Sequence, residues 1–280
     1  MGTIPFVKAH ACGNDFLIIE EAVAGRAHAA LARRLCARNT SIGADGIEFL
    51  ERRAGDKFFL RLFNADGSEA ELSGNGTRCV AAWLAHSEGL REVALGTRGG
   101  VRVCRVIEAR GADYLIESEM GVPRVMPRTI ELGGVGEVAG AMVNVGNPHF
   151  VIFVESEDFS SHGMSWQELG AKIAVDPGFK FGTNVEFVRV LKEDEIAFRI
   201  YERGCGPTTS SGTGTCASSA AAMVLRGAGR ELTAIAEGGA QGTAWPANDA
   251  PMLLMGPAEI VCQGEAFETG PEAERAVGAL

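Results

Sequence analysis

Apolar and polar positions alternate along much of this chain, and four stretches follow a helical period instead. The alternation predicts short strands separated by glycine-rich turns, at residues 6–10, 15–19, 47–51, 58–63, 92–95, 101–108, 112–119, 142–145, 150–154, 183–190, 196–202, 252–255 and 258–262. The helical period predicts helices at residues 27–38, 78–90, 165–173 and 216–226. Strands therefore dominate, with one apolar, alanine-rich helix in the middle of each half.

The pattern occurs twice. Ser73-Gly74-Asn75-Gly76-Thr77 returns as Ser211-Gly212-Thr213-Gly214-Thr215, and residues 47–50 and 61–64 match residues 185–188 and 199–202 at the same offset. A long period that keeps apolar patterns in register indicates a duplicated domain, since solenoid repeats are much shorter. We expect an α+β fold of two pseudo-symmetric lobes, each a barrel-like, mainly antiparallel sheet around a central helix.

The lobe boundary is predicted where prolines and glycines interrupt the pattern. Residues 126–140 contain Pro127 and several glycines, so we expect an N-terminal lobe at 1–130 and a C-terminal lobe at 131–267. Residues 268–280 are acidic and alanine-rich and are expected to form a frayed tail.

Charge and composition narrow the function. The 280 residues have a formal charge of -10 without a Lys/Arg cluster, which argues against a nucleic-acid partner. The start resembles no secretory signal, and no apolar run approaches the roughly 20 residues that span a bilayer. Seven scattered cysteines without CxxC spacing favour reduced thiols. We expect a cytoplasmic protein with a small-molecule partner and no membrane partner.

The paired loops carry the candidate chemistry. Glycines allow a close backbone approach, and the free amides at a helix N-terminus attract anions such as carboxylates. The alternative is that Ser73 and Ser211 are only helix N-caps; the duplicated context favours a binding site. Neither loop has the ending of a P-loop or the order of a Rossmann motif, no lysine indicates pyridoxal phosphate, and no His/Glu spacing indicates a metal site.

Seven short motifs that span nearly the whole chain resemble diaminopimelate epimerase, in the order of that family. They are Gly13-Asn14-Asp15-Phe16, Gly43-Ala44-Asp45-Gly46, Asn64-Ala65-Asp66-Gly67-Ser68, Gly74-Asn75-Gly76, Gly146-Asn147-Pro148-His149, Glu202-Arg203-Gly204 and Gly212-Thr213-Gly214. The resemblance implies a substrate closed between two lobes and a cofactor-free, two-base epimerisation, in which one cysteine thiolate removes the α-proton and a thiol on the opposite face returns one.

This chain has serines where the resemblance places both cysteines. Ser73 and Ser211 precede the glycines, and a serine hydroxyl is a much weaker acid than a thiol, so it needs a separate base. His149 and Glu202 are the candidate bases. Cys79 and Cys216 fall inside the predicted helices and are expected in the core, whereas Cys205 lies in the loop after Glu202. The two serines are either a natural divergence or a deliberate replacement.

The resemblance also implies a set of binding residues. The positions that match those holding the amino-acid ends of diaminopimelate or its carboxylate are Asn14, Asn64, Gly74, Asn75, Asn147, Asn184, Glu202, Arg203, Gly212 and Thr213. Taken singly, asparagines and glycines also favour turns, and a Glu-Arg pair occurs on many surfaces.

Three hypotheses follow. The first is a diaminopimelate epimerase-type isomerase, with Ser73, Ser211, His149 and Glu202 as the catalytic set and a role in lysine and peptidoglycan precursor synthesis. The second is an amino-acid-binding protein without turnover. The third is an isomerase of the same fold that acts on another acid through Glu202 or His149. All three predict a small amino-acid ligand and no metal or other cofactor, and all allow a homodimer.

Overall fold

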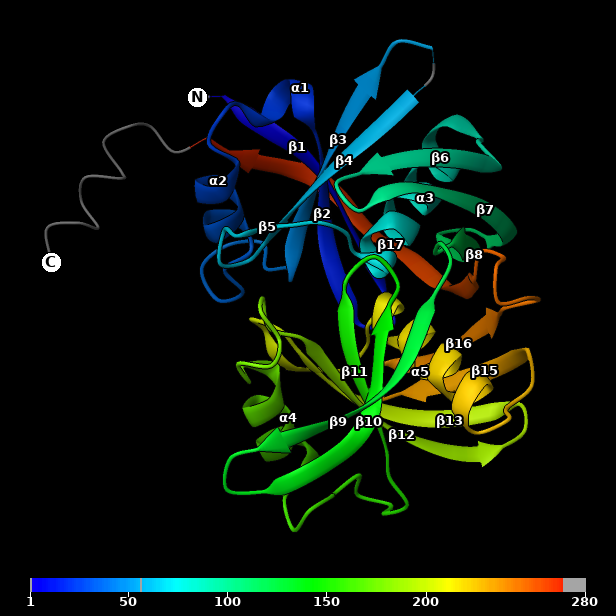
Figure 1. The fold of residues 1–280 in the computed structure, drawn as a ribbon. Coiled ribbons are helices and arrows are strands. Elements are labelled where there is room, and N and C mark those ends of the chain that lie inside the picture. Colours follow the sequence, from blue (N-terminus) through cyan, green and yellow to red (C-terminus); the bar gives the residue numbers. More distant parts are fainter. Residues whose placement is uncertain (1, 56, 269–280) are drawn as a thin grey trace, which may run out of the picture.

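The computed structural model describes residues 2–55 and 57–268, which form two lobes of curved sheet, each around one buried helix (Figure 1). The expected α+β fold of two similar lobes is confirmed. Apart from Glu268, the expected tail at 268–280 lies outside the described residues.

Seventeen strands and five helices make up the described chain. The strands are β1 (Thr3–Ala11), β2 (Asn14–Glu20), β3 (Gly46–Arg53), β4 (Lys57–Asn64), β5 (Glu69–Ala70), β6 (Glu92–Thr97), β7 (Gly100–Arg110), β8 (Asp113–Glu119), β9 (Arg124–Leu132), β10 (Gly136–Asn144), β11 (Pro148–Phe153), β12 (Asn184–Lys192), β13 (Glu195–Glu202), β14 (Gly206–Thr208), β15 (Glu231–Ala236), β16 (Gly239–Ala244) and β17 (Leu253–Phe267). The helices are α1 (Glu21–Ala24), α2 (His28–Leu35), α3 (Gly74–Glu88), α4 (Trp166–Ala174) and α5 (Gly212–Leu225).

The N-terminal lobe is a closed barrel of eight strands. Pairing runs from β1 through β2, β3, β4, β6, β7 and β8 to β17, which pairs again with β1. Two of these pairings are parallel, β2 with β3 and β4 with β6. Because closure removes free edges, the barrel holds α3 inside a continuous wall.

The C-terminal lobe repeats this pairing. Its strands follow the order β9, β10, β11, β12, β13, β15, β16 and the start of β17. The third and fifth pairings are parallel, β11 with β12 and β13 with β15, as are the third and fifth pairings of the N-terminal barrel when it is counted from the pair of β17 and β1. The shared pattern of parallel and antiparallel pairs is the structural form of the sequence duplication.

The expected lobe boundary at residue 130 is corrected by the pairing. Residue 130 lies within β9, which forms a hairpin with β10 across the turn between Leu132 and Gly136. The glycines between Leu132 and Gly136 make that hairpin turn, so they do not form a linker between the lobes. The lobes also share a strand, since β17 begins beside β16 and then runs along β8 and β1 of the other lobe.

Each lobe's central helix is buried on almost all sides. Leu84 and Val80 of α3 and Ala217 and Ala221 of α5 lie at the centres of the two main apolar clusters. Such helices must be apolar all round, which is why α5 consists largely of small uncharged residues. The smaller helices α2 and α4 cover the outside of the barrels over separate clusters.

Both central helices begin earlier than their apolar period predicts. They start at Gly74 and Gly212, four residues before the predicted starts, because Ser73 and Ser211 cap them. The remaining differences are also local. The predicted helix at 27–38 is shorter, and the two predicted strands at 252–262 are one long strand. The elements α1, β5, β9, β14, β15 and β16 were not predicted.

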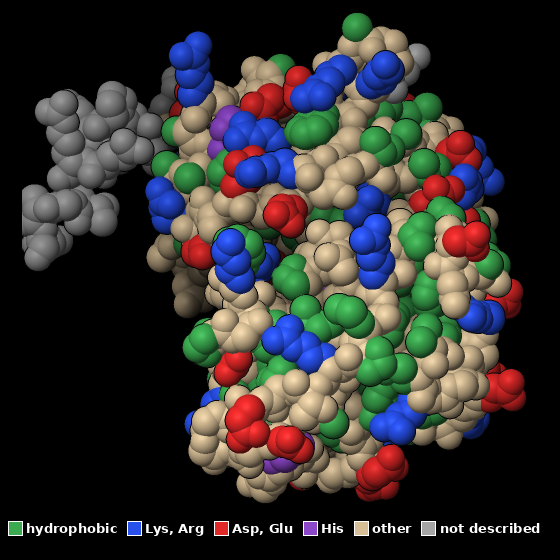
Figure 2. Space-filling model, in the orientation of Figure 1, with side chains coloured by type: hydrophobic (Ala, Val, Ile, Leu, Met, Phe, Trp, Pro, Cys, Tyr) green, Lys and Arg blue, Asp and Glu red, His purple; other side chains and the backbone are tan. Residues whose placement is uncertain are grey.

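The surface carries mixed charge. On the face drawn in Figure 2, Lys and Arg side chains lie among Asp and Glu side chains. Arg105, for example, pairs with Glu92, Glu117 and Glu119. Within the described residues no helix is both long and apolar enough to cross a membrane.

Candidate active site

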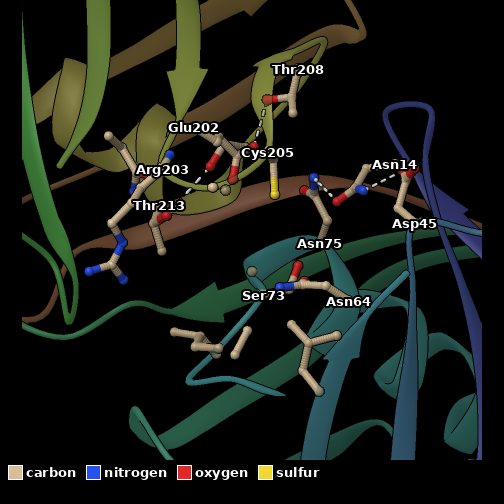
Figure 3. A pocket seen from close by; sticks show the side chains of 18 of the residues that line it. Asn14, Asp45, Asn64, Ser73, Asn75, Glu202, Arg203, Cys205, Thr208 and Thr213 are labelled. Atoms are coloured by element: carbon tan, nitrogen blue, oxygen red, sulfur yellow. Dashed lines mark hydrogen bonds between the residues drawn. The ribbon is translucent and has the colours of Figure 1, made fainter. Parts of the chain in front are cut away.

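A cavity of about 910 Å³ opens between the two lobes and is lined by both glycine loops. Figure 3 shows Ser73 and Asn75 from one lobe facing the side chains of Glu202, Arg203 and Thr213 from the other. Nearly all the residues expected at the site line this cavity: Asn14, Asn64, Ser73, Gly74, Asn75, Asn147, Asn184, Glu202, Arg203, Ser211, Gly212 and Thr213. His149 does not.

The two loops touch at their first glycines. A Cβ atom on Gly212 would lie 3.0 Å from the Cα atom of Gly74, and one on Gly74 would lie 3.2 Å from the Cα atom of Gly212. Only glycine permits this approach, which brings the N-termini of α3 and α5 to one place. Their unpaired amides and dipoles add there, so the junction suits a carboxylate or a developing negative charge.

The serines cap the helices as well as facing the cavity. Ser73 Oγ accepts a hydrogen bond from the Gly76 amide at 3.0 Å, and Ser211 Oγ accepts one from the Gly214 amide at 3.2 Å. The serines are therefore helix N-caps, and both also line the cavity. The further neighbour of Ser211 Oγ is Thr213 Oγ1 at 3.4 Å, and among the described residues neither serine has a hydrogen-bonded ionisable partner.

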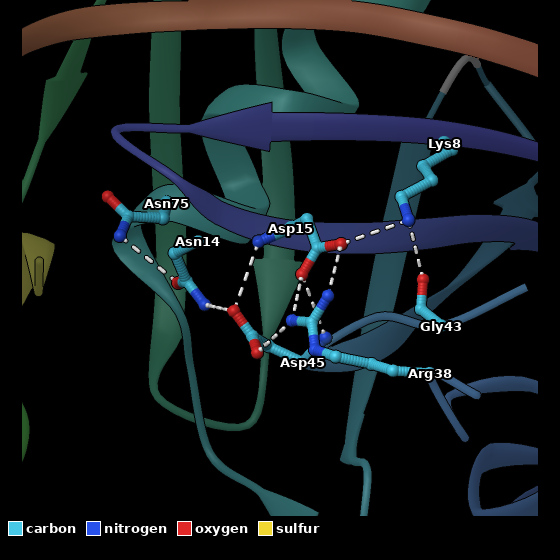
Figure 4. Close-up of polar contacts among 7 residues, drawn as sticks. All are labelled: Lys8, Asn14, Asp15, Arg38, Gly43, Asp45 and Asn75. Carbon is cyan, nitrogen blue, oxygen red and sulfur yellow. Dashed lines mark hydrogen bonds and ion pairs between the residues drawn. The ribbon is translucent and has the colours of Figure 1, made fainter. Parts of the chain in front are cut away.

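Charged groups hold the amides of the N-terminal lobe, and Figure 4 shows Asn75, Asn14 and the Asp45 end of this series. Arg78 Nη2 donates to Asn75 Oδ1 at 2.6 Å, Asn75 Nδ2 donates to Asn14 Oδ1 at 3.1 Å, and Asn14 Nδ2 donates to Asp45 Oδ2 at 2.6 Å. An arginine only donates and a carboxylate only accepts. The two charged ends therefore fix the orientation of both asparagine amides.

Asp45 is itself held by a larger ion cluster. Arg38 bonds Asp45 Oδ1 at 2.7 Å and Asp15 with both of its Nη atoms, and Lys8 bonds Asp15 from the other side at 3.1 Å. Burial opposes ionisation of Asp15, but the hydrogen bonds and charges of Arg38 and Lys8 keep its pKa below its usual value. Asp15 therefore remains an acceptor for Arg38, which in turn holds Asp45 at the end of the amide chain.

The C-terminal lobe holds its asparagine through a buried pair. His149 and Glu186 are both fully buried, with 2.5 Å between Nδ1 and Oε1, and His149 Nε2 lies 2.8 Å from Asn147 Oδ1. Asn147 Nδ2 donates to Thr213 Oγ1 at 3.3 Å. This corrects the expectation that His149 acts as a base, because both ring nitrogens are occupied and the ring does not reach the cavity.

Glu202 is an ionisable side chain that lines the cavity. Burial raises the pKa of its carboxyl group, partly opposed by the Thr208 hydroxyl, which donates to Oε1 at 2.6 Å. Its neighbour Arg203 is placed by Asn184, whose Oδ1 accepts from the Arg203 amide at 2.8 Å. Asn64, the counterpart of Glu202 in the duplication, donates to Ser68 Oγ at 3.0 Å.

The three cysteines considered in the sequence, Cys79, Cys205 and Cys216, do not lie in surroundings that favour a thiolate. Cys79 and Cys216 are fully buried in the helices, as expected, and burial raises both pKa values, that of Cys216 to about 12. Cys205 lines the cavity, but partial burial and the charges of Glu202, Asp66 and Asp45 raise its pKa as well. A thiolate favours the opposite surroundings, with positive charge nearby.

Sequence reasoning missed several residues behind the loops. Gln241 accepts from Thr215 Oγ1 at 2.8 Å and donates to Cys12 Sγ at 3.2 Å, which ties the two lobes together. Arg78 and Glu186 were missed as well. No local pattern marks them, although the equivalence of Glu48 and Glu186 in the duplicated strands is visible in the sequence.

Comparison with known proteins now adds to this geometry. The family model described as Diaminopimelate epimerase matches residues 6–126 and 141–261, two segments of equal length. The diaminopimelate epimerase of Pelotomaculum thermopropionicum is 36% identical, covering 93% of this chain and 98% of that protein. That of a Synechocystis species is 35% identical, covering 94% and 99%.

The chain belongs to the diaminopimelate epimerase family. It is therefore a member of a family of epimerase enzymes. Solved structures show the same fold at low identity. A hydroxyproline epimerase from Agrobacterium vitis has a TM-score of 0.75 at 13% identity, with 96% of this chain and 94% of that chain covered. A probable proline racemase from Agrobacterium radiobacter has a TM-score of 0.72 at 16% identity, with the same coverage.

Proposed function

We propose that this chain is a cofactor-independent epimerase that interconverts LL- and meso-diaminopimelate by proton transfer at Cα. The observation that carries the proposal is the contact between Gly74 and Gly212, which joins two helix N-termini at one carboxylate-sized junction. Ser73 and Ser211 flank that junction at the positions where the family resemblance places the proton-transferring cysteines. The reaction serves lysine and peptidoglycan precursor synthesis in the cytoplasm.

The proposed reaction moves only protons. A base takes the α-proton and leaves a carbanion whose charge spreads into the carboxylate, and a donor on the opposite face returns a proton to Cα. The amides of α3 and α5 stabilise the negative charge as it develops. Because serine is a weak acid, Ser73 or Ser211 needs help from a base such as Glu202, and we expect slow turnover.

A second candidate is an amino-acid-binding protein without turnover. The observation that favours it is specific: neither serine hydroxyl is hydrogen-bonded to an ionisable side chain within the described residues. An isomerase of a different acid through Glu202 is compatible with the same cavity.

Hydrogen exchange separates these candidates. The protein is incubated with LL- or meso-diaminopimelate in deuterated water, and deuterium at Cα is followed by mass spectrometry and NMR. Exchange that is lost in both Ser73→Ala and Ser211→Ala supports the epimerase. Binding without exchange supports the binding protein, and failure to bind either isomer refutes diaminopimelate as the ligand.

The double variant Ser73→Cys/Ser211→Cys is the matched gain-of-function test. If the rest of the pocket suits diaminopimelate, two thiols at the helix N-termini should raise the exchange rate strongly, because the thiol ionises far more readily than the hydroxyl. A folded double variant that binds diaminopimelate without faster exchange would contradict the assigned positions of proton transfer.

A further inference from the structure

Three polar side chains connect Ser211 to the buried carboxyl group of Glu186. The order is Glu186, His149, Asn147, Thr213 and Ser211, with successive distances of 2.5, 2.8, 3.3 and 3.4 Å. Glu186 and His149 are inaccessible to solvent, and Glu186 Oε2 has no hydrogen-bond partner. Within this hydrogen-bonded series only Glu186 and His149 can change protonation, and both are buried behind Asn147.

The orientation of Asn147 depends on a proton, unlike that of Asn14. Asn14 is fixed by Asp45, and its partner Asn75 by Arg78. The hydroxyl group of Thr213 can donate or accept, so it imposes nothing on Asn147. Only His149 decides: a protonated Nε2 requires the oxygen of the Asn147 amide to face it, and an unprotonated Nε2 requires the nitrogen.

We propose that Glu186 and His149 form a positioning pair whose shared proton sets the orientation of the Asn147 amide and, through Thr213, the hydrogen-bonding direction of the Ser211 hydroxyl group. The pair holds this proton either on Glu186 or as an imidazolium paired with a carboxylate. His149 Nε2 is protonated in both forms, so the orientation of Asn147 is the same.

When the pair loses this proton to solvent, the direction of each hydrogen bond from His149 to Ser211 is reversed. Glu186 then accepts from Nδ1, Nε2 becomes an acceptor, and Asn147 turns its nitrogen toward the ring. Thr213 next donates to the Asn147 oxygen, so Ser211 donates to Thr213 and its hydrogen is no longer free for a substrate. In the protonated state Thr213 donates to Ser211 Oγ instead, and the Ser211 hydrogen points elsewhere.

Other ionisable groups around the pair are few. Glu202 at the end of β13 acts on both members, because its negative charge favours the proton on the pair. From α5 the titratable group is the buried Cys216 thiol, whose pKa of about 12 keeps it neutral. The strand partners of His149 and Glu186 on β10, β11 and β13 are Val143, Val151 and Ile200. Burial raises the pKa of Glu186 itself.

The two lobes provide a matched control. Glu48 occupies the position of Glu186 in the first half and is equally buried, but the residue equivalent to His149 is Phe16. Beneath the glycine loops, a Cβ atom on Gly76 would clash with Glu48 Oε1, and one on Gly214 would lie 3.1 Å from Glu186 Oε1. Glu48→Gln therefore removes a similar buried carboxyl group without affecting the ring.

The test is the tautomer of His149 in the ligand-free wild-type protein. Ring ¹⁵N chemical shifts are followed between about pH 6 and pH 10, and the His149 signals are assigned by their loss in His149→Phe. We expect a protonated Nε2 at neutral pH and a single alkaline transition to protonated Nδ1. An unprotonated Nε2 at neutral pH overturns the proposal, as does the absence of a transition while the protein stays folded.

Variants and ligand binding give the second readout. Glu186→Gln should abolish the alkaline transition, and Glu48→Gln should retain it; the same transition in Glu186→Gln overturns the proposal. The ligand readout rests on the proposed function: affinity for meso-diaminopimelate should fall about fivefold across the transition, the effect of about one hydrogen bond. If diaminopimelate does not bind at all, the proposed function fails, whereas the ring titration still decides the positioning pair.

Discussion

Asn14 and Asn147 occupy equivalent positions in the two lobes but turn opposite ends of their amides toward the glycine loops. Asn14 accepts a hydrogen bond from Asn75 through Oδ1, whereas Asn147 donates one to Thr213 through Nδ2. The anchors behind them differ, because Asn14 faces the Asp45 carboxylate, which only accepts, whereas Asn147 faces the His149 ring, whose Nε2 is the donor in the proposed positioning pair. A nearly symmetric fold thus has an asymmetric pocket.

The first prediction concerns Asp45. In Asp45→Asn the side chain can both donate and accept, so Asn14 is no longer fixed, and Arg38 loses the negative charge of one of its partners. We expect affinity for meso-diaminopimelate to fall by about fivefold or more in calorimetry, equivalent to at least one net hydrogen bond. Glu92→Gln, which breaks an exposed ion pair with Arg105, is the control. Equal affinity of Asp45→Asn and wild type would contradict the role of the amide chain.

The contact between the lobes yields the second prediction. Gly212→Ala places a methyl group 3.0 Å from Gly74 Cα and 3.1 Å from Leu254 Cδ2, so the loops must separate. We expect a loss of about 1–3 kcal/mol in the free energy of unfolding and a clear loss of ligand affinity. Gly133→Ala is the control, since nothing lies within 4 Å of its Cβ position. If both variants behave alike, the loops are not in contact in solution.

Glu48 gives the third prediction, on pH and stability. Burial raises its pKa from 4.5 to about 8 in the folded protein. Between these values the folded chain binds more protons than the unfolded chain, so the free energy of unfolding should fall as pH rises through this window. Glu48→Gln should show a shallower fall than wild type in urea melts at about pH 5 and pH 8. If the free energy of unfolding falls equally with pH in Glu48→Gln and in wild type, ionisation of Glu48 does not destabilise the folded protein.

Arg78 supports the fourth prediction. Its guanidinium group is fully buried, donates to Asn75 and leaves Nε and Nη1 without hydrogen-bond partners; burial lowers its pKa. Arg78→Met removes an uncompensated charge at similar length, so we expect ligand affinity to fall while the free energy of unfolding stays equal or rises. A loss of several kcal/mol in stability would instead assign Arg78 a structural role.

The sequence determined much of this protein because its strongest signals are local. Serine is a preferred residue at a helix N-cap, alternation defines a strand through its own residues, and the duplication is visible in the printed chain. These features predicted two similar lobes and the paired loops, and the family resemblance added a set of polar residues and glycines that line the cavity. They could not show that residue 130 lies within a strand, or that β17 crosses between lobes, because strand pairing is set by contacts between distant segments.

The tertiary structure alone decided which polar groups are buried and what they face. His149 follows Asn147 and Pro148 in a motif that lines the cavity, so the sequence predicts an exposed base. The alternation of β11 turns its ring inward onto Glu186 of β12, far away in the chain. Glu48 has the same strand position and the same burial, but no histidine opposite it. The physical reason is that the sequence specifies the type of each side chain. The protonation and hydrogen bonds of that side chain depend on neighbours that come together only when the lobes are packed.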